Sequence, residues 1–320
     1  MNKIKLQIIS LFLVSVLLFS GLSIGGTIKN KISVLNKSDN FYFVQITDTH
    51  VMHKIFDRNE ASKNRLKSVL NHICSFNEKP AFIVITGDLT NWGGSWISGA
   101  INCKAFISCF YKEDNQFYAD ENHSIPVYTT PGNHEYNFNR NLNNYHKLIK
   151  NEDCYIVNYS NVSLFFINSG PNYYGKLYGW LRNIDGAGLY NCDIQWLESA
   201  LDNSSYSNKI ILMHHPAINS RSENGEMHGV IANNRINFID LCNEYNVDLV
   251  LTGHTHNSKV FDGNEQIYNF NNSLNCSLYS TLYVQTDDCK EGIHYRNVTF
   301  IGNDIWLENT VELGYTNIFN

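Results

Sequence analysis

The sequence predicts an α/β fold with a partly mixed β-sheet. Two observations lead to this prediction: strand-length apolar runs alternate with segments of helical spacing in the first half, and short strand-like segments fill the tail. The chain has 320 residues, of which 43% are hydrophobic and 13% aromatic, so it can bury a substantial core and is not mainly disordered. Because no repeat or linker is found, we predict a single domain over residues 27–320, with its motifs in 41–261 and a β-rich part at 262–320.

The first half supplies most of the alternation. Leu66, Val69, Leu70 and Ile73 recur at helical spacing. Strands are predicted at 41–46, 81–85 and 125–129, helices at 59–76 and 139–149, and an antiparallel pair at 155–157 and 163–167.

The second half continues the alternation and then becomes β-rich. Asp193 is of a residue type that caps helices, and we expect it to cap a helix at 194–201. A strand at 209–213, a helix at 233–245, and strands at 247–251, 259–261, 281–284, 298–301 and 305–307 follow.

The N-terminal segment predicts export. Lys3 and Lys5 precede an apolar run at 6–22, with small residues after it. Residues 1–26 therefore form either a cleaved signal peptide or an uncleaved membrane anchor, since the run is nearly long enough to span a bilayer. We expect a secreted or extracytoplasmic protein, with a possible membrane tether. N-x-[ST] sequons agree with an exported glycoprotein: Asn36, Asn122, Asn158, Asn161, Asn203, Asn271, Asn275 and Asn297.

Cysteine usage and charge exclude some classes of function. The even count of eight cysteines permits disulfides in an exported chain, and the closest pairs are Cys103 with Cys109 and Cys276 with Cys289. No C-x-x-C occurs, so a thiolate zinc site is not expected. The net charge of −6 argues against a nucleic-acid polymer as partner.

Polar clusters follow five of the predicted strands. In α/β sheets, ligands bind at the carboxyl ends of the strands, so we expect these clusters to converge on one site. They are Asp48-Thr49-His50, Gly87-Asp88, Gly132-Asn133-His134-Glu135, His214-His215-Pro216 and Gly253-His254-Thr255-His256.

These side chains are those of a metal site. Imidazole, carboxylate and amide ligands without thiolates suit divalent Zn, Mn, Fe or Co. They are too many for one ion, and Asp88 is placed to bridge two. A pair of ions about 3.5–4 Å apart can activate a shared water and hold both sides of an in-line displacement at phosphorus.

In this order, the motifs D-x-H, G-D, G-N-H-E, H-x-P and G-H-x-H resemble those of the calcineurin-like metallophosphoesterases. The resemblance covers Phe41 to about Phe261 and implies a four-layer αββα sandwich, with two facing mixed sheets flanked by helices. It further implies a first metal on Asp48, His50 and His256, a second on Asn133, His214 and His254, and Asp88 bridging both.

The resemblance also implies roles around the metals. His134 would be catalytic, protonating the leaving group or stabilising the developing charge, with Glu135 behind it. His215 would stand behind the ligands or in the core. His228 would either touch substrate phosphate or lie idle in a loop.

Residues 213–257 have a layout similar to the purple acid phosphatases, which carry a tyrosine where Asn91 stands and lack the histidine found here at His50. We therefore interpret the chain as a phosphoesterase with two divalent ions (Mn, Zn or Fe), acting by attack of a metal-bound hydroxide on a small-molecule or lipid-headgroup phosphate ester. A phosphodiesterase is favoured. The alternatives are an acid phosphomonoesterase and a non-catalytic interaction module on the same scaffold.

Overall fold

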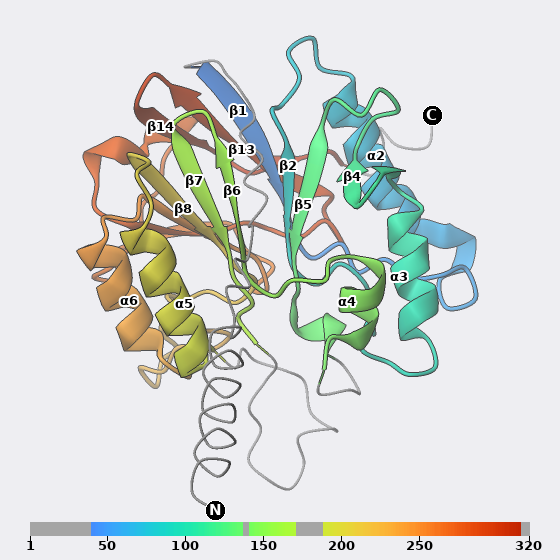
Figure 1. Cartoon of the computed structure of the whole chain (residues 1–320), viewed down its shortest axis with the longest axis horizontal. Helices are drawn as coiled ribbons and strands as arrows, with labels where there is room; N and C mark the ends of the chain where they lie inside the picture. Colours follow the sequence, from blue (N-terminus) through green and yellow to red (C-terminus); the bar gives the residue numbers. More distant parts are fainter. Residues whose placement is uncertain (1–39, 137–140, 171–187, 315–320) are drawn as a thin grey trace, which may run out of the picture. The chain divides into compact units, whose positions relative to one another are not determined.

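Two mixed β-sheets face each other in the computed structural model of the chain (Figure 1). The structure describes residues 40–136, 141–170 and 188–314, all of which belong to one compact unit, Val34–Asn320. The predicted signal or anchor segment 1–26 lies outside these residues. Among the described residues, no helix has both the length and the apolar character needed to cross a bilayer.

The first sheet carries three of the five predicted clusters. Strands β1, β2 and β5 run parallel at its centre, and antiparallel strands flank them. The order across the sheet is β11 (Ser273–Asn275), β14 (Asp304–Glu308), β13 (His294–Ile301), β1 (Asn40–Ile46), β2 (Ile83–Thr86), β5 (Pro126–Thr130), β4 (Gln116–Tyr118) and β3 (Tyr111–Glu113), with β15 (Val311–Glu312) paired to β13.

The second sheet carries the other two clusters. Its four central strands are parallel, and one antiparallel strand closes each edge. The order is β10 (Lys259–Asp262), β12 (Leu282–Gln285), β9 (Leu249–Thr252), β8 (Asn208–Leu212), β7 (Val162–Phe166) and β6 (Tyr155–Tyr159).

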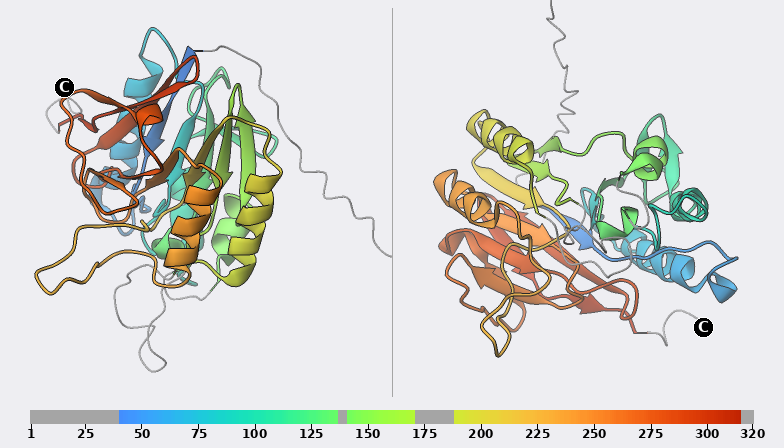
Figure 2. Two further views of the ribbon diagram at one scale, coloured as in Figure 1. Left: turned by 90° about the vertical axis from the view of Figure 1, so that its left-hand side faces the viewer. Right: turned by 90° about the horizontal axis from the view of Figure 1, so that it is seen from below.

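Helices cover the outer face of each sheet, which makes four layers (Figure 2). The first sheet is covered by α2 (Ala61–Cys74), α3 (Gly99–Ile107) and α4 (Asn143–Leu148), and the second by α5 (Asn191–Asp202) and α6 (Arg235–Glu244). Short 3-10 turns are η1 (Arg58–Glu60), η2 (Asn133–Glu135) and η3 (Cys276–Leu278). The αββα sandwich that the family resemblance implies is confirmed.

The central strands read as continuous apolar runs because both of their faces are buried. In β8, Ile210 and Leu212 pack between the sheets, whereas Ile211 packs under the helices of the second sheet. In β2, Val84 points between the sheets and Ile85 toward the helices of the first. Such strands are easy to find in a sequence, and their positions were predicted to within two or three residues.

Other expectations need correction. The residues alone predicted one partly mixed sheet, but two are present, because sheet pairing is not encoded in the apolar runs. Helix α3, the hairpin β3–β4, and the short strands β11 and β15 were not predicted. Helix α4 begins at Asn143, after the predicted start at 139, and residues 137–140 lie outside the described part. Asp193 is not the N-cap of α5: the helix begins at Asn191, and the Asp193 carboxylate accepts the Tyr190 N–H at 2.8 Å.

All eight cysteines are free thiols within the described residues, so the disulfides that the sequence permits are not formed. Cys103 lies within helix α3, which ends at Ile107, and Cys109 follows two positions after that end; both are free thiols. Cys276 packs between the two sheets, whereas Cys289 packs on the outer face of the first.

Candidate metal centre

The five predicted clusters meet at one edge of the sandwich, where β1, β2 and β5 of one sheet and β8 and β9 of the other end. Four overlapping groups offer ligand atoms that all lie within 4.8 Å of one another. These groups are Asp48–His50–His256, His50–Asp88–His134, Asp48–Asp88–His214 and His214–His215–His254.

Left-handed backbone brings these side chains inward. Asp48, His50, Asp88, His254 and His256 have φ values of 52°, 44°, 47°, 68° and 49°. Such values are uncommon for residues other than glycine, and they cost of order 1–3 kcal/mol each unless the surroundings hold them. Here the surroundings do so: the His50 N–H donates to the Asp88 carbonyl at 2.9 Å, and the His254 N–H to Asp48 Oδ2 at 2.9 Å.

Glycines allow the close approach of the strand ends. Gly87 has φ +85°, and a Cβ at this position would lie 2.4 Å from Nδ1 of His214. A Cβ on Gly253 would lie 1.8 Å from Oγ1 of Thr47. No larger residue fits at either position without moving the site.

Asp48, His50 and His256 form the first cluster. His256 Nε2 lies 3.3 Å from Asp48 Oδ1, and His50 Nε2 lies 3.7 Å from the same oxygen. The other Asp48 oxygen accepts the Thr47 hydroxyl at 2.7 Å, which fixes the carboxylate. The far nitrogen of His256, Nδ1, lies 3.3 Å from Oδ2 of Asp288, the residue three positions beyond β12.

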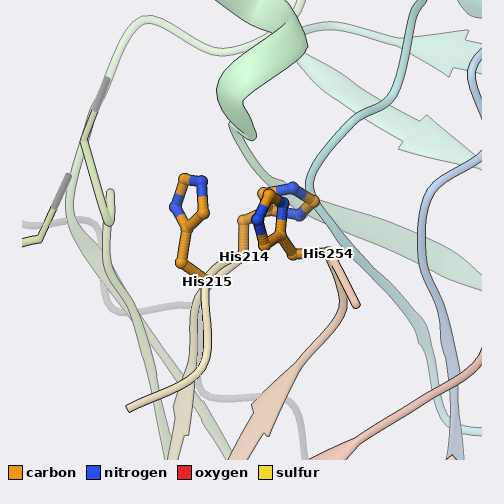
Figure 3. Close-up of side chains that lie close together, drawn as sticks. All are labelled: His214, His215 and His254. Carbon is orange, nitrogen blue, oxygen red and sulfur yellow. The ribbon is translucent and has the colours of Figure 1, made fainter. Parts of the chain in front are cut away.

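Asn133, His214 and His254 form the second cluster. His214 Nε2 lies 3.0 Å from Asn133 Oδ1, and His214 Nδ1 donates to the Thr86 carbonyl at 2.8 Å. The rings of His214 and His254 are 5.1 Å apart. Figure 3 shows these two rings beside His215, whose ring centre lies 4.5 Å from that of His254. Because Nδ1 of His214 is engaged with the backbone, Nε2 is the atom that faces the cluster.

Asp88 lies between the two clusters. Its Oδ1 is 3.3 Å from Nε2 of His214, and its Oδ2 is 3.6 Å from Nε2 of His50 and 3.7 Å from Nε2 of His134. The carboxylate thus presents one oxygen to each side. A carboxylate in this position can bridge two ions.

Glu135 supports the loop that carries Asn133 and His134. Its carboxylate accepts N–H groups of Gly132 at 2.8 Å and Thr90 at 3.0 Å. These bonds join the loop after β5 to the loop after β2. Burial and the charge of Asp88 raise the pKa of Glu135 to about 8, and the backbone N–H groups oppose this rise.

The aspartates of the site are held in their charged form. Burial is the largest single effect and raises the pKa of Asp48 and of Asp88, but His214 and the other histidines around them together outweigh it and hold both pKa values well below their usual range. In return, Asp88 and Asp48 raise the pKa of His214 to about 9 against its burial. Partial burial lowers the pKa of His256, yet its close contacts with the carboxylates of Asp288 and Asp48 raise this pKa to about 10.

Two other histidines are neutral at pH 7. Burial lowers the pKa of His134 to about 4, and burial with the charge of His214 lowers that of His254 to about 4. Neutral imidazoles have a free lone pair, which a ligand needs, and one N–H to donate.

Comparison with known proteins decides the family. The family model for calcineurin-like phosphoesterases matches residues 41–258. The chain belongs to the calcineurin-like phosphoesterase family. It is therefore a metal-dependent phosphoesterase, as the sequence predicts.

The individual proteins that the chain resembles are distant from it in sequence. The chain is 26% identical over 220 residues to a probable glycerophosphodiester phosphodiesterase, GpdQ, of Arcobacter nitrofigilis, covering 67% of this chain and 71% of that protein. Purple acid phosphatase PPD1 of yellow lupin is a similar structure (TM-score 0.58, 14% identity), covering 89% of this chain but only 56% of the lupin enzyme. GAP50, described as the anchor in the inner membrane complex of Plasmodium, is another (TM-score 0.54, 14% identity, 88% of this chain and 87% of GAP50). At these identities the solved structures support the fold alone.

The buried clusters fit the metal ions that the calcineurin-like phosphoesterases use. Asp48 Oδ1, both ring nitrogens of His50 and Nδ1 of His134 are buried and have no hydrogen-bond partner among the described residues. Orphaned polar atoms of this kind are costly in a folded protein unless a ligand satisfies them. Nitrogen and oxygen donors in two clusters that share Asp88 are consistent with a dinuclear site.

The remaining predicted residues lie around this centre. His215 is buried, and its Nδ1 is 2.7 Å from the Ser169 hydroxyl, so it stands behind His254. The Asn91 side chain points to the Met52 sulfur at 3.3 Å. His228 is on an exposed loop whose next residue, Gly229, approaches the His254 ring. Contact of His228 or Asn91 with substrate stays a prediction.

Sequence reasoning missed Asp288 and Ser169. Asp288 follows a predicted strand, as the five clusters do, and Asp287-Asp288 was a signal of the same kind. Its strand, β12, lies beside β9 in parallel, which places Asp288 next to His256. Ser169 follows β7 in the same way but has no acidic or imidazole neighbour in sequence.

Proposed function

We propose that the protein is an exported phosphodiesterase that uses two divalent ions, held by Asp48, His50 and His256 on one side and by Asn133, His214 and His254 on the other, with Asp88 between them. Ions in these positions would lower the pKa of water and stabilise negative charge on phosphoryl oxygens. The complete set of donors around Asp88 carries this proposal.

Among the protein's own residues, His134 is placed to contact the substrate. His134 is the most exposed of the histidines around Asp88, with 25% of its side chain accessible against 5% for His50 and 0% for His214. Its ring is neutral at pH 7 and retains one N–H. We assign the N–H of His134 to a hydrogen bond with the leaving-group oxygen or the charged phosphoryl oxygen, with Glu135 holding its loop.

Two observations support a diester over a monoester. Asn91, which stands where the purple acid phosphatases carry tyrosine, bonds toward Met52 and offers no phenolate. The curated relative is named a probable glycerophosphodiester phosphodiesterase. The substrate class is a phosphodiester of a small molecule or a lipid headgroup.

A pair of model substrates tests this function. The purified protein, loaded with Mn or Zn, is expected to hydrolyse bis-p-nitrophenyl phosphate at least tenfold faster than p-nitrophenyl phosphate. An inactive Asp88→Asn variant purified in parallel excludes a contaminating phosphatase. Preference for the monoester with an acid optimum would replace the proposal by a phosphomonoesterase. Absence of metal-dependent hydrolysis of both esters would favour the interaction module.

Export is tested separately. We expect the protein, expressed in a eukaryotic secretory host with its own N-terminus, to reach the lumen and gain mass that a glycosidase removes. A chain that stays in the cytosol without sugar would contradict this part and leave the chemistry untouched.

A further inference from the structure

Large apolar side chains are exposed next to the metal centre. Trp96 is 84% exposed, Ile55 70% and Ile97 69%. Together with three less exposed neighbours they form what we call the apolar patch: Ile55, Phe56, Trp92, Trp96, Ile97 and Ile101. Grouped apolar exposure of this kind marks an interaction surface, whereas single exposed residues do not.

The apolar patch is continuous across two segments that are distant in sequence. The rings of Phe56 and Trp92 meet edge to face, with centres 6.2 Å apart. The His53 N–H donates to Asn102 Oδ1 at 3.0 Å, which fixes the first segment on helix α3. Ile101 lies one position before Asn102 on the same helix.

Each of the two segments follows directly in the chain after a residue of the metal centre. Val51 and Thr90 form a parallel bridge, so the chains leaving His50 and Asp88 run side by side. Trp92 follows Asp88 by four positions, which is at most about 14 Å of chain. The Gly94 N–H then donates to the His134 carbonyl at 3.2 Å. The apolar patch therefore borders the metal centre.

Three exposed basic side chains lie on the same segments as the apolar patch, although the whole chain has a net charge of −6. Lys54, Arg58 and Lys104 are exposed beside it. The acidic groups of the same region are engaged: the Asp57 carboxylate accepts the Ser62 N–H at 2.7 Å, and Glu60 pairs with Lys63 at 3.4 Å. The surface thus combines exposed apolar and aromatic side chains with exposed cations.

We propose that the apolar patch docks the protein on an anionic lipid bilayer, with the metal centre beside the membrane surface. Tryptophan favours the boundary between headgroups and acyl chains, and exposed lysine and arginine are attracted to anionic headgroups. The combination of exposed tryptophan and exposed lysine on the same segments favours a bilayer over a protein partner. Docking does not depend on the proposed hydrolysis, because it is measured without substrate.

Tryptophan fluorescence tests the docking on the full chain. The probes are vesicles of phosphatidylcholine with one fifth phosphatidylserine, in which part of the phosphatidylcholine is brominated in its acyl chains. Residues 1–39 contain no tryptophan, so a membrane anchor at the N-terminus alone gives no quenching. We expect quenching that disappears in the Trp92→Phe/Trp96→Phe variant.

Further variants keep Trp92 and Trp96, whose fluorescence reports binding. Ile55→Ser/Ile97→Ser is expected to weaken vesicle binding about tenfold or more. Lys54→Gln/Lys104→Gln should weaken binding to the anionic vesicles about fivefold for each lysine, with little effect on pure phosphatidylcholine. The matched control is Ile236→Ser/Leu278→Ser, since these side chains are 57% and 77% exposed but lie outside the patch.

The proposal is overturned if wild-type tryptophan is not quenched on either vesicle. It also fails if the control variant loses binding as the patch variant does, or if quenching persists without Trp92 and Trp96. Concentration-dependent dimerisation that only the patch variant abolishes, without vesicle binding, would assign the surface to a second copy of the chain instead. Circular dichroism and thermal unfolding of each variant establish that it is folded before binding is compared.

Discussion

The carboxylate of Asp288 lies 3.3 Å from Nδ1 of His256, while the opposite nitrogen of the same ring lies 3.3 Å from Asp48. The imidazole is thus held between two carboxylates from different strands. The Asp48 side faces the first cluster, and the Asp288 side fixes the ring orientation and tautomer. Carboxylates behind ligating histidines strengthen metal binding in this way.

Asp288→Asn is expected to weaken metal binding at the first cluster by about 10- to 100-fold, because the carboxylate that orients His256 is lost. Titration calorimetry with Zn or Mn measures the affinity, and NMR titration of the metal-free protein should show the pKa of His256 falling from about 10. Asp287→Asn is the matched control, since its carboxylate faces His294. Equal affinities in the two variants would contradict the role of Asp288.

Metal affinity is expected to rise with pH between 6 and 8. In the metal-free protein the pKa of His214 is about 9 and that of His256 about 10, so both carry a proton at neutral pH that an ion must displace. Each ion should therefore bind about tenfold more weakly for each unit that the pH falls. Competition with a chelator of known affinity measures this slope. A metal affinity that does not change with pH would show that neither His214 nor His256 holds this proton in the metal-free protein.

His134→Ala should lower turnover of a phosphodiester by about 10²- to 10⁴-fold and leave metal content unchanged, because its N–H stabilises charge on the substrate and it is no essential ligand. Asp88→Asn should lower both turnover and metal content, since it removes charge from the position shared by the two clusters. Rates are compared with metal content measured by mass spectrometry. Near wild-type turnover in both variants would refute the assigned roles.

Gly87→Ala should destabilise the fold by several kcal/mol and impair metal binding, because a Cβ there collides with His214 at 2.4 Å. Gly225→Ala is its control: that glycine also has positive φ, +77°, but its Cβ would meet nothing within 4 Å. The control should cost about 1 kcal/mol, the conformational penalty alone. Chemical denaturation gives both values, and similar losses would mean that the neighbouring ring can move aside.

The central strands and the five clusters were accessible from sequence because each lies in one short stretch of chain. An apolar run buried on both faces is followed at once by Asp, His or Asn, as from Ile83 to Asp88. The role of Asp288 was not accessible, because it requires the knowledge that β12 pairs with β9. Helix α3 was missed for a local reason: its buried face includes Gly99 and Asn102, which are not apolar, while Ile101 is exposed, so its apolar residues do not show helical spacing.

The candidate ligands are divided between the two sheets, with Asp48 and Asp88 on one and His214 and His254 on the other. Ions bound among them would act as cross-links between two layers that also pack through apolar side chains and share the hydrogen bond from Gln45 Nε2 to the Thr252 carbonyl at 3.1 Å. Sliding one layer over the other would pull Asp88 away from His214 and dismantle both coordination spheres together. The packing of the two sheets and the affinity for two ions are therefore coupled. A substitution that shifts the sheets should weaken ion binding, and loss of the ions should loosen the packing of the sheets.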